Sequence, residues 1–531
     1  MPNDCITYQN SGYFSRLIVD YLDQKTELKS LYNRFPTINN FKLQIEEKNN
    51  NFPIENRAIL VDALKKQYEK FIVSEETLNH IDLLNQSNTF TITTGHQLNL
   101  FTGPLYFLYK IISVINLTKE LKAEYPDYNF VPVYWMATED HDFDEINFFN
   151  FKNKKIQWKK ESSGPVGRLN TSGLDEVFEV FSNELGLGDN AFYLKELFKK
   201  SYLEHNNLAD ATRYLTNELF KNNGLVIIDG DDKNLKKLFI PYVKNELIHQ
   251  TSYKKVTDTL PLLQDYDVQV NPREINLFYI QDNLRERIIF ENGNYKINNS
   301  SLTFSEREIL TELENRPENF SPNVILRPLY QEVILPNLCY IGGGGEIAYW
   351  LELKSNFEEN NVTFPILLLR NSVLIATKKQ EEKMTKLNLS WAEVFEKQDN
   401  LINKKTEEFS SFTIDFSNQK KTLEEQFKLM YEIANKTDKS FLGAVKAQEA
   451  KQLKGLDKLE KRLLKAEKRN HSEKLERIIQ IQNELFPNQT LQERKANFAL
   501  FYNEINNFEA FFSLLKTQLQ PLTQNFSIVI I

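Results

Sequence analysis

Glycine, cysteine and long apolar runs are all scarce in this chain of 531 residues. Its two cysteines, Cys5 and Cys339, exclude a disulfide framework and a zinc cluster built on cysteine. No apolar run reaches the roughly 18 residues of a membrane span, and the start of the chain lacks the basic and apolar segments of a signal peptide. We therefore expect a folded cytoplasmic protein that makes no membrane contact.

The charge is uneven along the chain. The net charge of −8 argues against nucleic acid as a partner of the whole chain. Residues 446–480 nevertheless hold eleven Lys/Arg and six Asp/Glu. Such an excess is typical of a solvated helix face, and the alternative is a surface for phosphate or an acidic partner.

Several apolar runs predict the strands of a parallel sheet. The runs are TFTITT (89–94), FVPVYWMAT (130–138), GLVIIDG (224–230) and FPILLLR (364–370). Apolar residues at helical spacing fill residues 105–125, between the first two runs. Strand, helix and strand form a βαβ unit with a right-handed crossover. We therefore predict an α/β fold with a doubly wound core.

Two segments interrupt this predicted core. Residues 148–222 begin with a Lys-rich, hairpin-like piece and then become helical. From residue 265 apolar and polar residues alternate, which predicts a small antiparallel sheet. We expect a core domain over 1–380 with insertions at about 148–222 and 265–320.

From about residue 381 the pattern is helical almost to the end. Apolar positions step by 3-4-3 in two sets with different phases: Leu456, Leu459, Leu463 and Ala466, then Leu475, Ile478, Gln482 and Leu485. This pattern predicts an α-helical coiled coil over 381–487 with a phase break near Asn470, on which residues 419–435 can fold back. The uncovered seam predicts a homodimer. Pro487 ends the long helix, and residues 488–531 are expected to be a helical tail that packs on the body.

A loop rich in small and polar residues follows the first predicted strand. It lies at the carboxyl edge of the sheet, where ligands bind, and leads to a helix N-terminus that favours phosphate or carboxylate. His96 could donate a proton there, and Thr102 could cap the helix, with Pro104 in its first turn. The alternative is a turn whose histidine is only hydrogen-bonded. The binding candidates are Thr94, Gly95, Gln97, Thr102 and Gly103.

An acidic cluster follows the second predicted strand. Glu139, Asp140, His141 and Asp142 stand together, with two further carboxylates just beyond them. Such a group could bind Mg²⁺, bind a substrate amine or act as a general base. The alternative is a solvated acidic turn that caps a helix. With His96, the residues Asp140, His141 and Asp142 are the catalytic candidates, and Glu139 is a binding candidate.

A third group combines arginine with glycine. Arg327 suits a carboxylate or phosphate, and Gly342, Gly343, Gly344 and Gly345 offer clustered N–H groups. The alternative is a tight turn before a helix over 346–357. Further binding candidates are Gln331, Glu346, Arg370 and Ser372. We expect one pocket to be lined by His96, Asp140, His141, Asp142, Arg327 and Glu346, with Arg327 and the glycine amides holding an anion.

Together these blocks resemble the BshC family, the cysteine ligases of bacillithiol biosynthesis. The resemblance rests on TTGHQLNLFTGPLYFLYK, VPVYWMATEDHDFDEIN, ILRPLYQEVILPNLCYIGGGGEIAYW, LLLRNS and LFPNQTLQER, in this order along essentially the whole chain. It implies a Rossmann-like core with two connecting-peptide insertions, similar to class I synthetase-type nucleotidyltransferases, and a coiled-coil domain that mediates dimerisation.

The resemblance also implies a reaction. Cysteine would be joined through its carboxyl group to the amine of glucosaminyl-malate, with ATP as cosubstrate and Mg²⁺ as a candidate ion. GHQ at 95–97 stands in the place of the synthetase HIGH signature but keeps one histidine, and LRNS at 369–372 stands where a KMSKS loop would fall. No zinc is expected, because two distant cysteines cannot form a thiolate site. The rival classes are a nucleotidyltransferase-like enzyme with another small substrate and a non-catalytic coiled-coil adaptor.

Overall fold

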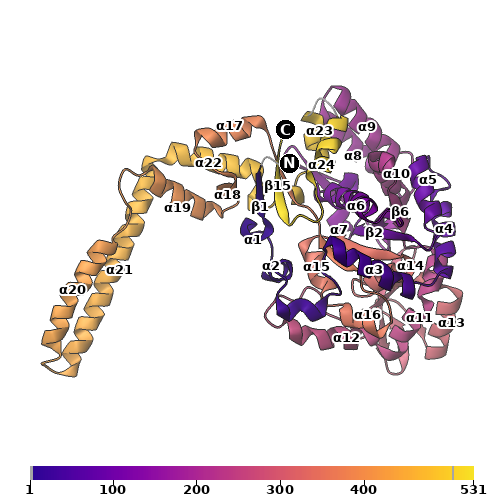
Figure 1. Cartoon of the computed structure of the whole chain (residues 1–531), viewed down its shortest axis with the longest axis horizontal. Helices are drawn as coiled ribbons and strands as arrows, with labels where there is room; N and C mark the ends of the chain where they lie inside the picture. Colours follow the sequence, from indigo (N-terminus) through magenta and orange to yellow (C-terminus); the bar gives the residue numbers. More distant parts are fainter. Residues whose placement is uncertain (1–3, 505–507) are drawn as a thin grey trace. The chain divides into compact units, whose positions relative to one another are not determined.

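The computed structural model describes residues 4–504 and 508–531, which divide into two compact units (Figure 1). The first unit contains Met1–Leu374 and Gln492–Val529, and the second contains Ile375–Leu491 and Ile530–Ile531. No helix in the described part of the chain has the length and apolar character needed to cross a bilayer.

A parallel five-stranded sheet forms the centre of the first unit. In spatial order its strands are β13 (Ile366–Leu369), β12 (Asn337–Gly342), β2 (Thr89–His96), β3 (Asn129–Met136) and β6 (Val226–Asp229). The predicted runs all form strands, and α6 (Tyr106–Glu124) is the predicted helix between β2 and β3. Strand β12 is not among the predicted runs, because its buried residues lead directly into the four glycines.

The strand order reverses between β2 and β12. From β2 the chain adds β3 and β6 on one side, and β12 and β13 then extend the sheet on the other side. The carboxyl ends of β2 and β12 therefore flank a topological switch point, the place where open α/β sheets bind ligands. Residues Thr94–His96 and Gly342 stand at this point.

Helices cover both faces of the sheet, as in a doubly wound fold. On one face, Phe90 and Ile92 of β2 share an apolar cluster with α6 and with Phe41 of α3 (Ile38–Asn51). Strand side chains alternate between the two faces. On the opposite face, Trp135 of β3 therefore meets Tyr330 of α14 (Arg327–Ile334), with ring centroids 5.5 Å apart.

The first predicted insertion contains a hairpin and a set of helices. The hairpin pairs β4 (Phe148–Phe151) with β5 (Lys154–Gln157). The helices that follow are α8 (Leu174–Leu185), α9 (Asp189–Tyr202) and α10 (Leu208–Phe220). Strand β6 and the helices α11 (Lys233–His249) and α12 (Thr251–Thr259) come next along the chain.

The second predicted insertion is built on an antiparallel sheet, with strand order β10-β9-β8-β7-β11. The strands are β7 (Leu277–Gln281), β8 (Leu284–Glu291), β9 (Asn294–Ile297), β10 (Thr303–Phe304) and β11 (Phe320–Pro322). Helix α13 (Glu306–Asn315) lies between β10 and β11 in the sequence. Residues 265–276, where the alternation begins, contain no strand.

Two local predictions about helices are wrong. The helix expected over 346–357 is two short helices, α15 (Gly344–Trp350) and α16 (Lys354–Glu359). Thr102 does not cap α6, and Pro104 is not in its first turn, because α6 begins only at Tyr106 after Leu105. Phe101 and Thr102 both have positive φ, so the backbone turns sharply there instead of entering the helix.

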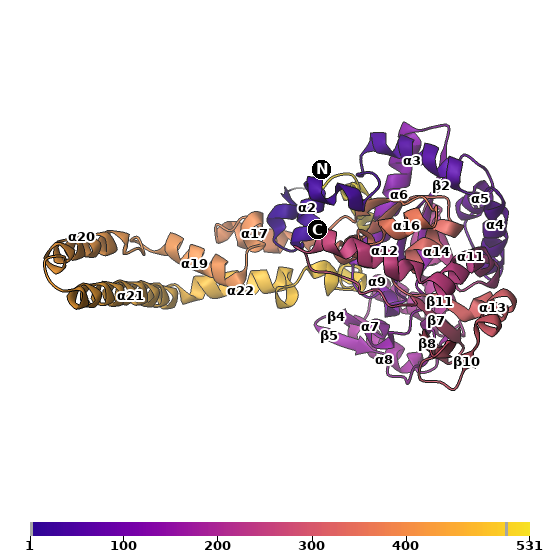
Figure 2. The ribbon, with the colours of Figure 1, turned by 90° about the horizontal axis from the view of Figure 1, so that it is seen from below.

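The second unit is helical. Its helices are α17 (Lys378–Lys386), α18 (Trp391–Val394), α19 (Gln398–Phe409), α20 (Ser417–Ala434), α21 (Lys439–Asn470) and α22 (Ser472–Leu485). Figure 2 shows α20 and α21 side by side as a long antiparallel hairpin. Lys420 of α20 pairs with Asp457 at 2.8 Å and Glu460 at 2.7 Å, which sets the register of this hairpin. The break between α21 and α22 at His471 confirms the predicted phase break.

The C-terminal tail begins with α23 (Phe498–Glu504) and α24 (Phe508–Gln518). Asn116 of α6 donates hydrogen bonds to the Lys516 and Leu519 carbonyls, which tie α24 to the core. The tail is not helical throughout, because β15 (Asn525–Ile530) pairs antiparallel with β1 (Asp4–Thr7). A single short apolar run such as this one carries no periodicity that separates strand from helix, so the sequence does not predict β15.

Candidate functional site

A buried lysine lies at the switch point. Nζ of Lys110, on α6, donates to the Gly95 carbonyl at 2.8 Å and pairs with Glu346 Oε2 at 2.5 Å. Glu346 also accepts from the Tyr340 hydroxyl at 2.6 Å and the Gly343 N–H at 2.8 Å. Sequence reasoning missed Lys110. The feature that could have revealed it is a lysine surrounded by apolar residues in the first half of α6.

Burial and charge act on this ion pair in opposite directions. Burial lowers the pKa of Lys110, and the Glu346 carboxylate opposes that shift. Burial alone would raise the pKa of Glu346, but the charge of Lys110 and three hydrogen bonds outweigh it and hold that pKa below its usual range. Glu346 is therefore an anion at neutral pH.

Arg327, the first residue of α14, faces the same end of the sheet. Its Nη1 donates to Gln331 at 3.0 Å, and its guanidinium lies 5.8 Å from the Trp135 ring and 5.6 Å from the Tyr340 ring. Its buried Nη2 has no hydrogen-bond partner among the described residues. A Cβ on Gly95 would lie 3.3 Å from the Tyr340 hydroxyl, which is a tight contact, and 3.7 Å from Arg327 Nη1.

Arg370, at the exit of β13, is a second buried arginine. Its Nη2 pairs with Glu493 Oε1 at 2.6 Å, and Nη1 donates to the Ser372 hydroxyl at 3.2 Å. The guanidinium lies 5.0 Å from the Tyr106 ring. Its Nε is buried and, within residues 4–504 and 508–531, makes no hydrogen bond.

His96, the last residue of β2, lies against the rings of Tyr106 and Phe107, with centroids 5.2 and 5.1 Å away. Only 8% of its surface is exposed, and its Nε2 lacks a hydrogen-bond partner in the described part of the chain. Burial, followed by the positive charges of Lys110 and Arg370, lowers the pKa of His96 well below 6.5. The imidazole is therefore neutral at pH 7.

The remaining candidates near the switch point have structural partners. The Thr94 hydroxyl donates to the Ile341 carbonyl at 2.7 Å and so ties β2 to β12. Gln331 links Arg327 to Glu332. Of the glycine tetrad, Gly342 ends β12, Gly343 precedes α15, and Gly344 and Gly345 begin that helix. Because Glu346 accepts the Gly343 N–H, that one amide of the tetrad already has a partner within the protein.

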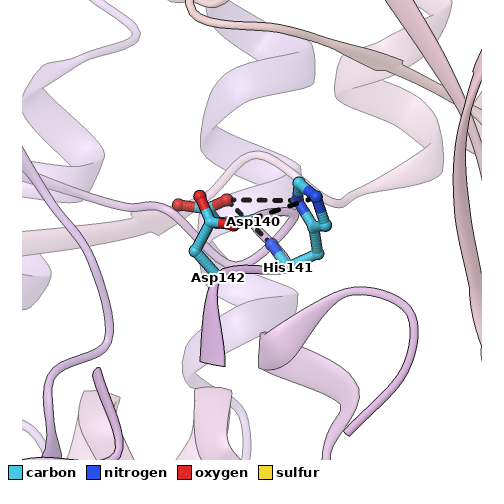
Figure 3. A group of neighbouring side chains, drawn as sticks. All are labelled: Asp140, His141 and Asp142. Carbon is cyan, nitrogen blue, oxygen red and sulfur yellow. Dashed lines mark hydrogen bonds and ion pairs between the residues drawn. The ribbon is translucent and has the colours of Figure 1, made fainter. Parts of the chain in front are cut away.

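The acidic cluster follows β3 and remains partly exposed. Figure 3 shows Asp140, His141 and Asp142 turned toward one another. Arg285, from β8 of the second insertion, donates to His141 Nδ1 at 2.5 Å, a contact that the sequence did not predict. Burial would raise the pKa of Asp140, but contacts with His141, a hydrogen bond from Gln97 and the charge of Arg285 outweigh it and lower that pKa.

The cluster is a poor fit for Mg²⁺. Asp140, His141 and Asp142 bring ligand atoms within 4.8 Å of one another. However, the Arg285 guanidinium contacts the imidazole and lies 4.0 Å from Asp140. A doubly charged ion would be repelled by that guanidinium, and Mg²⁺ prefers an all-oxygen octahedron. A single substrate amine suits this group better.

Glu139 is held in a separate charged network. Lys236 of α11 pairs with Glu139 at 2.6 Å and with Asp231 at 3.2 Å. Arg168, from the first insertion, pairs with Asp231 at 2.8 Å and with Asp282 at 3.1 Å. These contacts brace the loop after β3 against both insertions, so Glu139 has a structural partner.

Two groups of candidates thus stand along one edge of the sheet. The basic group contains Lys110, His96, Arg327 and Arg370, and the acidic group contains Asp140, His141 and Asp142. Gln97, the residue after His96, donates its amide to Asp140 at 2.8 Å and to Glu145 at 3.1 Å. Thr102 and Gly103 lie in the buried loop before α6. Cys339 is buried in the apolar cluster of the sheet.

This fold and site define a Rossmann-like α/β protein with buried cationic side chains at its switch point. Residues 1–371 match the family described as bacillithiol biosynthesis BshC, N-terminal Rossmann-like domain. Residues 373–531 match the C-terminal coiled-coil domain of the same family. The chain belongs to the BshC family.

Relatives match over the full length of the chain. A protein of Flavobacterium johnsoniae is 65% identical over 531 residues, covering 100% of both chains. A protein of Christiangramia forsetii is 57% identical, covering 100% of this chain and 99% of its own. One from Bacillus anthracis is 29% identical, covering 92% and 93%. All three carry the name "Putative cysteine ligase BshC".

Proposed function

We propose that the protein is a cysteine ligase of bacillithiol biosynthesis that adds cysteine to glucosaminyl-malate, with ATP-dependent activation of the cysteine carboxyl group. The observation that carries the proposal is a set of buried donors without partners among the described residues: Arg327 Nη2, Arg370 Nε and His96 Nε2. Buried polar groups are nearly always hydrogen-bonded, so unpaired donors at a ligand edge are explained by an anionic ligand.

The basic group suits the negative charges of this reaction. Cysteine carboxylate, malate carboxylates and nucleotide phosphates are all anions that arginine binds through paired N–H groups. Neutral His96 can donate a hydrogen bond to an oxygen on which negative charge develops, without adding another cation beside Lys110. Lys110 supplies a fixed positive charge, already oriented by Glu346.

Amide formation requires an activated acyl group. In the proposed route a cysteine carboxylate oxygen attacks the α-phosphorus of ATP, and the bond to the β-phosphate oxygen breaks as pyrophosphate leaves. The glucosaminyl-malate nitrogen then attacks the acyl carbon, AMP leaves with the former carboxylate oxygen, and the nitrogen loses a proton. Asp140 and Asp142 would bind this amine, and Asp142 would accept its proton.

The direct test is reconstitution with purified protein. Incubation with ATP, cysteine and glucosaminyl-malate should produce bacillithiol, with one AMP and one pyrophosphate per product, measured by mass spectrometry. Omission of each substrate in turn is the control. Absence of product under every nucleotide and metal condition would refute the ligase. AMP transfer to another small substrate would instead support the rival nucleotidyltransferase.

His96→Ala tests the role of the site itself. We expect turnover to fall by about 10²–10³-fold, the usual effect of removing a donor to developing charge. Circular dichroism should show an intact fold. Full activity in this variant, or its unfolding, would make His96 a structural residue.

We further propose that two chains associate through the second unit. Leu429, Met430 and Ile433 of α20 and Phe441 and Leu459 of α21 are large apolar residues with 45–63% of their surface exposed. An apolar seam on a helical hairpin is normally buried against a partner. A second copy of the same hairpin can cover it in an isologous two-fold dimer.

A further inference from the structure

Both carboxylate oxygens of Glu493 accept hydrogen bonds from residues 370–373, at the exit of β13. The residue is fully buried. Its Oε1 accepts from Arg370 Nη2 at 2.6 Å and from the Ser372 hydroxyl at 3.1 Å, and its Oε2 accepts from the Val373 N–H at 3.1 Å. This arrangement fixes the Arg370 guanidinium, while its Nε has no hydrogen-bond partner among the described residues.

Asn497, four residues after Glu493, donates its side-chain amide to a different backbone segment, the loop before α6. It is also fully buried. Its Nδ2 donates to the Phe101 carbonyl at 2.8 Å and to the Gly103 carbonyl at 2.6 Å. Between the two side chains, the Ala496 carbonyl accepts the Leu105 N–H at 2.8 Å, just before α6 begins.

The loop that Asn497 holds is strained. Phe101, Thr102 and Gly103 have φ angles of 47°, 68° and 59° in succession. Non-glycine residues in this region cost free energy and persist only where the surroundings over-determine them. Here the Asn497 amide holds the carbonyls, while the Phe101 N–H donates to the Tyr202 hydroxyl at 2.8 Å.

The strained loop leads directly into Tyr106, which contacts two of the candidate site residues. Tyr106, at the start of α6, lies against both His96 and Arg370, at 5.2 and 5.0 Å. Displacement of the loop would therefore move Tyr106 and alter the setting of both side chains. Displacement of residues 370–373 would move Arg370 itself.

We propose that Glu493 and Asn497 are positioning residues: the segment Gln492–Asn497 holds two backbone segments near the switch point of the sheet, 101–105 and 370–373. Neither side chain is offered as a catalytic residue, because each acts through the groups it holds. The kinetic part of this inference rests on the proposed ligase function. The structural part does not.

Hydrogen exchange tests the structural part without any reaction. In Glu493→Gln one acceptor oxygen must serve three donors, so amide exchange should rise in peptides covering 369–374. In Asn497→Ala it should rise in peptides covering 99–106. Other peptides should keep wild-type protection, as should the whole chain in Glu473→Gln and Asn418→Ala, which change exposed residues. Uniform loss of protection, or no change in the two flanking segments, would overturn the proposal.

A double-mutant cycle tests the kinetic part. Glu493→Gln should lower kcat/KM about tenfold to a hundredfold, because a small misplacement of a binding group is costly. Added to Arg370→Gln, it should lower kcat/KM no further, since Glu493 acts through Arg370. Multiplicative losses would refute that role. If glutamine prevents folding, Glu493→Asp retains the charge for the same cycle. Should the wild type form no bacillithiol, the ligase proposal fails while the exchange result still decides this one.

Discussion

Replacing Lys110 by methionine should uncouple stability from activity. The side chain is 4% exposed and forms the buried pair with Glu346. Removing one partner of such a pair costs about 3–5 kcal/mol, because the other charge stays buried. The low end applies here, since Glu346 keeps its hydrogen bonds from Tyr340 and Gly343 and is 25% exposed.

The expected change in melting temperature follows from the size of the first unit. The unit has roughly 410 residues. At about 2.1 cal/mol/K per residue, its entropy of unfolding is about 0.9 kcal/mol/K. A loss of about 3 kcal/mol then lowers the Tm by roughly 3–4 °C. Activity at 25 °C should fall far more, by about 10²–10³-fold, because an oriented charge at the reacting group is lost.

Calorimetry and the bacillithiol assay measure the two effects on the same preparation. Arg57→Met is the matched control, since Arg57 is a buried cation at the amino end of β2 that donates to the Leu84 and Thr89 carbonyls. It should lower the Tm by a similar amount and leave kcat/KM per folded molecule unchanged. If Lys110→Met keeps more than about a third of wild-type kcat/KM, Lys110 has no part in the reaction.

Three further perturbations test other parts of the molecule. The pKa of folded His96 lies well below its unfolded value of 6.5, so protonation favours unfolding and the stability of the protein should fall as the pH drops below about 6.5. In melts from pH 8 to 5, the stability of His96→Ala should fall less steeply than that of the wild type, and equal slopes would contradict the argument. Arg327→Lys loses the planar fork and should weaken binding of an anionic substrate at least about tenfold by calorimetry, whereas unchanged affinity would place the anion elsewhere. Ile433→Asp should convert a dimer of about 125 kDa to the 62.4 kDa chain in light scattering, and a wild-type monomer would exclude the proposed interface.

Sequence periodicity predicted the sheet and the helical hairpin because burial acts on them locally. The run 364–370 is apolar up to Arg370, and 89–94 is rich in β-branched residues, which are patterns of buried strands. Strand β12 carried the same signal but was hidden by the glycines that follow it. The break at His471 was visible because two heptad phases meet there.

The partners within the site could not be predicted in the same way. Lys110 meets Glu346, and Arg370 meets Glu493, only through long-range folding. A sequence shows that a charged residue stands among apolar neighbours, but it does not show which opposite charge the fold brings beside it. The strand pattern placed His96 in the loop just after residues 89–94, whereas β2 in fact extends to His96. The low pKa of His96 depends on burial and on cations from α6 and from the exit of β13.

The pairing of β1 with β15 has a consequence for the order of synthesis. Strand β1 is synthesised more than 500 residues before β15, so it must wait for that length of chain before its partner exists. At about 5–20 residues per second, that delay is on the order of half a minute to two minutes. Glu493 and Asn497 also arrive only at the end. A nascent chain that lacks these residues therefore contains the strands of the parallel sheet but not the contacts that hold 101–105 and 370–373.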